Sequence, residues 1–328
     1  RCFAHVIFDQ LDNFKGPWDI CLAGLLLLET RMIGPTLDAI VAAQAQLRSD
    51  LIETPILPLT SARWDGTLPD CAGVTLKLEL FQQAGSFKAR GALLGIRNLT
   101  DAQRAAGVVA ASGGNHALAV SWAAKAAGVD ALITMPKATD PARVAGCEAL
   151  GATVQLYDDM ATAFAAMNEA ASNGRAMMHP FEAEHMILGA ATCGMEYATQ
   201  APQIDTYVIP IGGGGMISGM ACAIKQLNPN AQVIGVEPYG ADSMTQSFAA
   251  GQAVRIEKVD TIADSLGAPL AMPLTYEVTR AYVDRIVRIA DHDMLAAMDI
   301  YQNNLRITAE PACAASLAAI LGPLKDEL

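Results

Sequence analysis

The residues that could do chemistry begin with a single lysine. Lys88 follows residues 74–80, whose alternating apolar side chains predict a strand, and precedes residues 89–97, which predict a helix. A lysine at a helix start lies near the positive end of the helix dipole, which disfavours the ammonium form of its amine. A neutral amine can attack a carbonyl and form a Schiff base. Taken alone, a lysine after Gly85 and Ser86 is more often a solvated first-turn residue.

A second candidate segment follows a predicted strand at 107–111. Its residues are Ser112, Gly113, Gly114, Asn115 and His116. Two glycines let the backbone approach a ligand closely. The free N–H groups at the start of the next predicted helix, 117–127, suit an anion such as a carboxylate. A plain turn with an asparagine cap explains the same residues equally well.

Four consecutive glycines form the third candidate segment, between a predicted strand at 206–211 and a predicted helix at 216–227. They are Gly212, Gly213, Gly214 and Gly215. Each costs roughly 1 kcal/mol more to order than an alanine, and a phosphate held by successive N–H groups at a helix start would justify that cost. The spacing is not that of a Walker loop. Because Glu237 is followed at once by Pro238, no acid stands at the usual distance for a nicotinamide ribose, and a dehydrogenase is the weakest alternative.

Together, the three segments predict one site. Ligands of α/β sheets lie at the carboxyl ends of the strands, where these loops are expected to meet. A reactive lysine, a carboxylate loop and a phosphate loop suit a phosphorylated aldehyde cofactor with a small amino-acid substrate, which is pyridoxal phosphate chemistry. A fourth loop, 308–311, is interpreted as a plain helix start with proline in the first turn.

The elements that must position these loops follow a β-α-β-α order from residue 107 onward. Predicted strands are 107–111, 130–135, 153–157, 206–211, 232–236 and 282–289, and predicted helices are 117–127, 141–150, 160–171, 216–227, 292–305 and 311–321. This alternation indicates an α/β fold with parallel sheets covered by helices on both faces.

Composition excludes several other classes of protein. The 328 residues carry a net charge of −12, and 5% of them are aromatic, which argues against a nucleic-acid partner. The seven cysteines are scattered without a C-x-x-C pair, as expected of reduced thiols in a cytoplasmic protein. The apolar run at 20–28 is too short to span a membrane and lacks the flanks of a signal peptide. Residues 1–31 are therefore interpreted as an N-terminal extension outside the core, and the final four residues, 325–328, as a coincidental match to a retention signal.

The motifs resemble those of a known family in both content and order. They are residues 85–92, 112–117, 179–182, 210–215 and 235–238. The sequence is similar to the serine/threonine dehydratase branch (threonine deaminases and serine racemases) of the fold-type II pyridoxal-phosphate enzymes. The resemblance implies a tryptophan synthase β-like fold with two three-layer α/β/α domains and parallel-rich sheets. The large, cofactor-binding domain would be 32–106 with 183–328, the small domain 107–182, and the assembly a homodimer.

The resemblance also implies roles for single residues. Lys88 would form the Schiff base and later remove the substrate α-proton, Phe87 would pack beside the cofactor ring, and Asn115 would bind the ring hydroxyl. The phosphate would lie on residues 212–215, with Met216 beside them. The substrate carboxylate would be bound by Ser112, Gly113, Gly114, Asn115 and His116.

The reaction implied is loss of water from serine, threonine or 3-hydroxyaspartate, giving a 2-oxo acid and ammonia. His116 favours this branch over the β-replacement enzymes, which usually carry threonine after the asparagine. Racemases of the branch have a serine before Gly-Asn-His, where this chain has Gly113, so dehydration is favoured and racemisation is the alternative.

Two departures from the family pattern leave further alternatives open. A divalent cation, magnesium or calcium, would be held by Glu237 and Ala241, but Ser243 occupies the place of the third ligand, an aspartate. The chain ends at Leu328, before a last strand and a Gly-Asn turn that family members normally have. A non-catalytic remnant is therefore a second alternative.

Overall fold

The computed structural model describes residues 33–328, except residues 61–63, 65 and 72. The prediction about residues 1–31 lies outside this described part. No described helix is both long and apolar enough to cross a membrane.

A four-stranded parallel sheet lies within residues 108–177. Its strands, in the spatial order β5-β4-β3-β6, are β3 (Val108–Ala111), β4 (Ala131–Pro136), β5 (Thr153–Tyr157) and β6 (Ala176–Met177). The helices between them are α5 (Asn115–Ala127), α6 (Pro141–Ala149) and α7 (Met160–Ser172). Side chains alternate along β3, so Val108 and Ala110 share a core with α5, whereas Val109 and Ala111 pack against α7. The two helices therefore cover opposite faces of the sheet.

A second parallel sheet has the order β7-β8-β9 and carries the glycine loop. Its strands are β7 (Thr206–Pro210), β8 (Gln232–Pro238) and β9 (Arg285–Ile289). Tyr207 and Ile209 pack with α9 (Gly215–Leu227), while Val208 between them packs with α13 (Pro311–Leu321) on the other face. A short antiparallel pair, β1 (Ile56–Pro58) and β2 (Thr75–Lys77), completes the strands of the described part.

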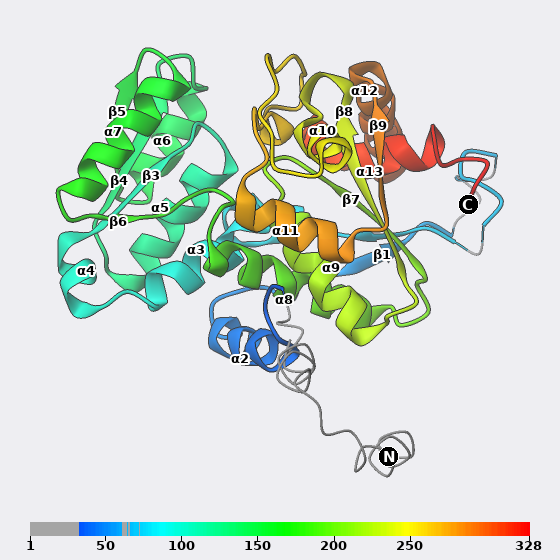
Figure 1. The fold of residues 1–328 in the computed structure, drawn as a ribbon, viewed down its shortest axis with the longest axis horizontal. Coiled ribbons are helices and arrows are strands. Elements are labelled where there is room, and N and C mark those ends of the chain that lie inside the picture. The colour runs from blue at the N-terminus through cyan, green and yellow to red at the C-terminus, as the bar shows by residue number, and fades with distance from the viewer. Residues whose placement is uncertain (1–32, 61–63, 65, 72) are drawn as a thin grey trace, which may run out of the picture. The chain divides into compact units, whose positions relative to one another are not determined.

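The remaining helices join these sheets and cover them (Figure 1). They are α2 (Leu37–Leu47), α3 (Lys88–Arg97), α4 (Asp101–Ala106), α8 (Glu184–Gln200), α10 (Ser243–Ala250), α11 (Pro273–Tyr282) and α12 (Asp291–Ile300). Helix α3, which begins with Lys88, packs against both α5 and α8. It therefore links the region of the first sheet to that of the second.

The predicted α/β class with parallel sheets is confirmed, while some element boundaries are wrong. The strand expected at 74–80 ends at Lys77, and a 3₁₀ helix, Glu79–Phe81, follows it. The strand expected at 282–289 starts only at Arg285, because α11 runs to Tyr282. The helix expected at 292–305 ends in a π-helical turn, Tyr301–Leu305. The division into domains 32–106 with 183–328 and 107–182 stays a prediction.

Candidate active site

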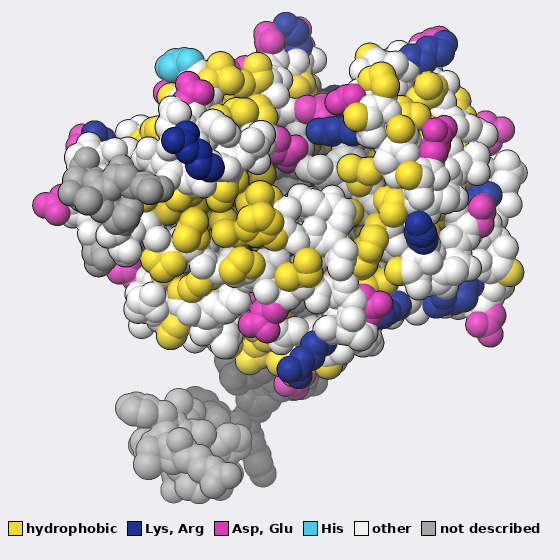
Figure 2. Space-filling model, turned by 180° about the vertical axis from the view of Figure 1, so that it is seen from behind, with side chains coloured by type: hydrophobic (Ala, Val, Ile, Leu, Met, Phe, Trp, Pro, Cys, Tyr) yellow, Lys and Arg dark blue, Asp and Glu magenta, His cyan; other side chains and the backbone are white. Residues whose placement is uncertain are grey.

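A cavity of about 1380 Å³ brings the three predicted segments together. Lys88, the loop 112–116 and the glycine loop 212–215 all line it. The cavity continues along β7, where the Ser316 hydroxyl donates to the Val208 carbonyl at 2.8 Å. From behind, the molecule shows a hollow beside the part that carries the first sheet (Figure 2).

Lys88 lies inside this cavity as the first residue of α3. Its Nζ donates to the Pro180 carbonyl at 2.8 Å and lies 4.9 Å from the centre of the Phe87 ring. Burial lowers the pKa of the Lys88 amine to about 8, and the negative charge of Glu310 opposes this shift. The sequence predicted a lowered pKa from the helix dipole, but the main physical cause is desolvation.

The glycine loop has no side chains, and neighbouring parts of the protein occupy the space that side chains would need. Gly214 has a φ of +87°, and α9 begins at the next residue. A Cβ at Gly213 would come within 2.3 Å of the Phe181 ring, and one at Gly212 within 2.8 Å of the Ser265 carbonyl oxygen. The first N–H groups of α9 have no partner within the helix and provide donors for a phosphate. Met216 is the second residue of this helix and lines the same cavity.

The loop 112–116 leads directly into α5. The Ser112 hydroxyl accepts from the Gly114 N–H at 3.0 Å, and Asn115 is the first residue of the helix. The His116 side chain is buried, and its Nε2 donates to the Met178 carbonyl at 2.8 Å. Burial and the nearby Lys88 amine lower the pKa of His116 to about 3, so its ring is neutral. The contribution we expect from His116 to carboxylate binding is therefore that of its backbone N–H.

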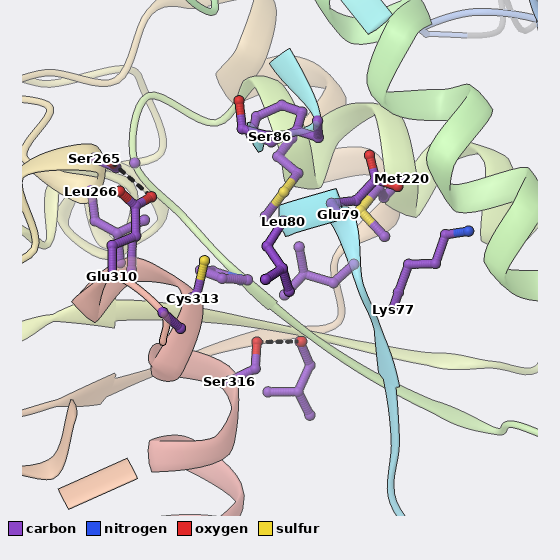
Figure 3. Close-up of a pocket in the computed structure, with 18 of the residues that line it drawn as sticks. Lys77, Glu79, Leu80, Ser86, Met220, Ser265, Leu266, Glu310, Cys313 and Ser316 are labelled. Carbon is purple, nitrogen blue, oxygen red and sulfur yellow. Dashed lines mark hydrogen bonds between the residues drawn. The ribbon is translucent and has the colours of Figure 1, made fainter. Parts of the chain in front are cut away.

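Glu310 is a site residue that the sequence analysis missed. Asn115 Nδ2 donates to Glu310 Oε1 at 2.8 Å, and the Ser265 hydroxyl donates to the same oxygen at 3.1 Å (Figure 3). Glu310 is the N-cap residue of α13 and Pro311 is in its first turn, as the sequence predicted, but the Glu310 side chain makes no hydrogen bond to the helix start and lines the cavity instead. An acid directly before the proline that opens a helix was the available signal.

The cavity fits pyridoxal phosphate in three independent respects. It offers a buried amine of lowered pKa, a side-chain-free cradle at a helix start, and polar side chains directed inward. One of these is Ser86, whose buried hydroxyl has no hydrogen-bond partner among the described residues. The described residues therefore provide for an aldehyde and for a phosphate at the same site.

The cation site predicted at Glu237 and Ala241 does not fit the structure. Both carboxylate oxygens of Glu237 are taken, one by the Met244 N–H at 2.8 Å and the other by the Thr245 N–H at 2.7 Å and its hydroxyl at 2.6 Å. The neighbouring Asp242 is paired with Arg288 at 2.9 Å. The described residues contain no group of three histidine, cysteine, aspartate or glutamate side chains that could hold a metal ion.

This fold and this cavity define a pyridoxal-phosphate enzyme of fold type II. The family described as pyridoxal-phosphate dependent enzyme matches residues 48–327, and the chain belongs to it. The predicted family, fold class and pyridoxal-phosphate cofactor are thereby confirmed, and the predicted ammonia-lyase class rests on the similar proteins that follow.

Two of the similar curated proteins and one solved structure are a dehydratase, an ammonia-lyase and a racemase. A phenylserine dehydratase of Ralstonia pickettii is 44% identical over 295 residues, covering 90% of this chain and 89% of that protein. An L-threonine ammonia-lyase of Thermotoga maritima is 35% identical, covering 88% and 72%. The solved structure of maize serine racemase has a TM-score of 0.84 at 34% identity, covering 90% of this chain and 88% of that one.

Proposed function

We propose that the chain removes water from a small β-hydroxy amino acid, giving a 2-oxo acid and ammonia. The observation that carries this proposal is the Lys88 amine, which lies in the cavity lined by both the glycine loop and the loop 112–116. The candidate substrates from the sequence are serine, threonine and 3-hydroxyaspartate. The name of the Ralstonia relative adds phenylserine.

The cofactor, when bound, supplies the electron sink that stabilises the negative charge left at the substrate α-carbon. Residues 212–215, with Met216, are expected to bind the phosphate, Phe87 to pack on the ring, and Asn115 to bind the ring hydroxyl. The N–H groups of the loop 112–116 are expected to orient the substrate carboxylate. The Lys88 Nζ takes the α-proton, because an amine with a pKa of about 8 both accepts and returns a proton near neutral pH. The β-hydroxyl then leaves as water with a proton that the Lys88 ammonium returns, and the released enamine takes up a water molecule to give the 2-oxo acid and ammonia.

The test compares the purified wild-type protein with Lys88→Ala in the presence of added cofactor. The wild type should develop the visible absorption of a lysine-bound cofactor and produce a 2-oxo acid from at least one of the four substrates. The variant should do neither. A wild type that stays colourless with added cofactor would contradict the proposal and favour the non-catalytic alternative.

The likeness to maize serine racemase makes racemisation the second candidate. Racemisation needs a second proton donor on the opposite face of the substrate, and Gly113 has no side chain to provide one. A Cβ at Gly113 would also meet the Thr139 hydroxyl at 2.6 Å. Chiral chromatography of unreacted serine after turnover decides between the two, because accumulation of D-serine would show racemisation.

The proposed setting is a homodimer in the cytoplasm. Hydrophobic side chains gather on the face seen in Figure 2, where a second copy could cover them. Sedimentation of the purified holoenzyme should give twice the mass of the chain. A monomer at micromolar concentration would contradict the dimer.

A further inference from the structure

One wall of the cavity is built from apolar side chains of α7. Met160 and Phe164 lie one turn apart on this helix, which places them on the same face, and both line the cavity. Met160 is 38% exposed, and Phe164 packs partly buried against the cluster that contains Ala111 and Met167. Because Ala111 directly precedes Ser112, the Phe164 ring lies close to the loop expected to bind the substrate carboxylate.

This wall continues as a row of rings toward the reactive amine. The centre of the Phe164 ring is 6.1 Å from that of His179, and the His179 ring meets Phe181 edge-on at 4.8 Å. Between these two residues lies Pro180, whose carbonyl oxygen is 2.8 Å from Lys88 Nζ. Burial, together with the charge of Lys88, lowers the pKa of His179 to about 4, so the row is uncharged at neutral pH. Phe164 and Phe181 line the cavity themselves, and the neutral His179 ring packs between them behind the lining, so the apolar rings lie beside the place where the substrate would react.

The positively charged side chains near the site either are paired with acids or belong to the reactive Lys88. In the described part, the cations lining the cavity are Lys88 and Lys77, and Lys77 is bound to Glu196 at 3.0 Å. Arg143 approaches the loop 112–116 through the Gly113 carbonyl at 3.3 Å, but its guanidinium also faces Asp264 and Glu310, each at 3.8 Å. Apart from Lys88 itself, the described cations that line or approach the cavity are thus already paired with acids, so a second substrate carboxylate, as in 3-hydroxyaspartate, is disfavoured.

We propose that the cavity is specific for β-hydroxy amino acids that carry an aromatic ring on the β-carbon, and that Phe164 and Met160 recognise that ring. This inference rests on the proposed dehydratase function and names its substrate class. An aromatic substituent packs edge-on or offset against Phe164 and gains the sulfur contact of Met160. The methyl group of threonine is too small to contact both Phe164 and Met160.

The test measures substrate preference in the holoenzyme. The ratio of kcat/KM for 3-phenylserine to that for L-threonine should favour phenylserine in the wild type and fall about 10- to 100-fold in Phe164→Ala. Phe164→Leu keeps the packing against the sheet and should lower the ratio less. Phe81→Ala is the matched control, because Phe81 is an exposed phenylalanine outside the cavity lining, and it should leave the ratio unchanged.

A binding measurement provides a readout that does not need turnover. L-phenylalanine and L-2-aminobutyrate lack the β-hydroxyl and cannot lose water. In calorimetric titrations of the wild type, phenylalanine should bind at least about tenfold more tightly than aminobutyrate. Phe164→Ala should remove this preference, and Met160→Ala should reduce it.

The outcomes separate the inference from the function on which it rests. Turnover of threonine or serine with no preference for phenylserine or phenylalanine would overturn the aromatic subsite and leave the dehydratase function standing. A phenylalanine preference that depends on Phe164, without turnover of any hydroxy amino acid, would support the subsite and overturn the dehydratase function. Equal losses for both substrates in Phe164→Ala, with no change in the ratio, would also overturn the inference.

Discussion

Two cationic residues in the first turn of α3 have opposite environments. Lys88 faces the cavity, where its hydrogen-bond partner is the Pro180 carbonyl and its charge is disfavoured by desolvation. Arg90, two positions later, is 1% exposed and forms two hydrogen bonds to each of two carboxylates, Glu79 and Glu196. These bonds, at 2.7 to 2.9 Å, raise the pKa of Arg90 even though its burial acts in the opposite direction.

The difference shows how the effect of burial on a charged group depends on whether opposite charges and hydrogen bonds surround it. A buried group keeps its charge only if opposite charges and hydrogen bonds replace the lost water. Arg90 has them, and it anchors β2, the 3₁₀ helix and α8 to α3 by means of Glu79 and Glu196. Lys88 has a carbonyl and, at longer range, the carboxylate of Glu310, which Asn115 and Arg143 also contact, so its amine loses a proton easily. One turn of helix thus contains both a fixed structural cation and a reactive amine.

Replacing Lys88 by alanine should cause the largest loss of activity of all these variants and leave the stability of the fold unchanged or higher. Loss of the proton-transfer group should reduce kcat by ~10³-fold or more. The melting temperature of the cofactor-free protein should stay equal or rise, because a desolvated amine is removed. Steady-state kinetics and thermal unfolding of the same preparations check both parts. A marked loss of stability would mean that Lys88, like Arg90, is a structural cation.

Replacing Arg90 by methionine should have the converse result. Glu79 would be left as a buried, uncompensated charge and Glu196 would keep only its pair with Lys77, so the free energy of unfolding should fall by ~3–5 kcal/mol. Urea unfolding followed by circular dichroism measures this loss. Arg48→Met is the matched control, because Arg48 is exposed at the end of α2, and it should change stability by less than ~0.5 kcal/mol. If the two variants were equally stable, the buried network would contribute nothing.

The contrast between these two residues also marks the limit of sequence reasoning. Gly85, the glycine loop and the β-α alternation are local patterns, and they predicted the fold class, the cofactor and the position of Lys88 at a helix start. The partners of Arg90 depend on tertiary packing: Glu196 lies 106 positions away in the chain. Glu310 meets Asn115 across 195 positions, so neither pair leaves a signal at fixed spacing. Burial, the main cause of the shifted pKa of Lys88, depends on the same long-range contacts.

The protonation of Lys88 can be followed directly through its reaction with the cofactor. A neutral amine attacks an aldehyde and an ammonium does not, so the rate of colour development in cofactor-free protein should rise as pH increases and level off above about 8. A lysine with the usual pKa of 10.5 would still be gaining rate well above that value. Stopped-flow absorbance, recorded at pH values around and between 8 and 10.5, measures the pH at which the rate is half of its maximum. A midpoint near 10.5 would mean that the cavity does not desolvate the amine.

Glu237 extends the comparison to a buried acid that accepts hydrogen bonds from Met244 and Thr245 but contacts no cation within the described part of the chain. Glu79, beside Arg90, has its pKa lowered, whereas burial raises the pKa of Glu237 from 4.5 to about 7, although three hydrogen bonds oppose the shift. The pKa of Glu237 is higher in the folded than in the unfolded protein, so proton binding to Glu237 stabilises the fold. This contribution is complete below pH 4.5 and is lost as pH rises to about 7. The loss is at most ~3 kcal/mol.

Glu237→Gln should therefore remove this part of the pH dependence. The free energy of unfolding of the wild type, compared with that of the variant, should decline across the interval from pH 4.5 to 7 and stay parallel above it. Urea titrations at several pH values in this interval measure the difference, and Glu257→Gln, at an exposed position, controls for the loss of one negative charge. A difference that does not change with pH would mean that the hydrogen bonds from α10 hold Glu237 ionised, as Arg90 holds Glu79. A cation would then be unnecessary to keep a buried acid charged in this fold, and hydrogen bonds from a helix start would suffice.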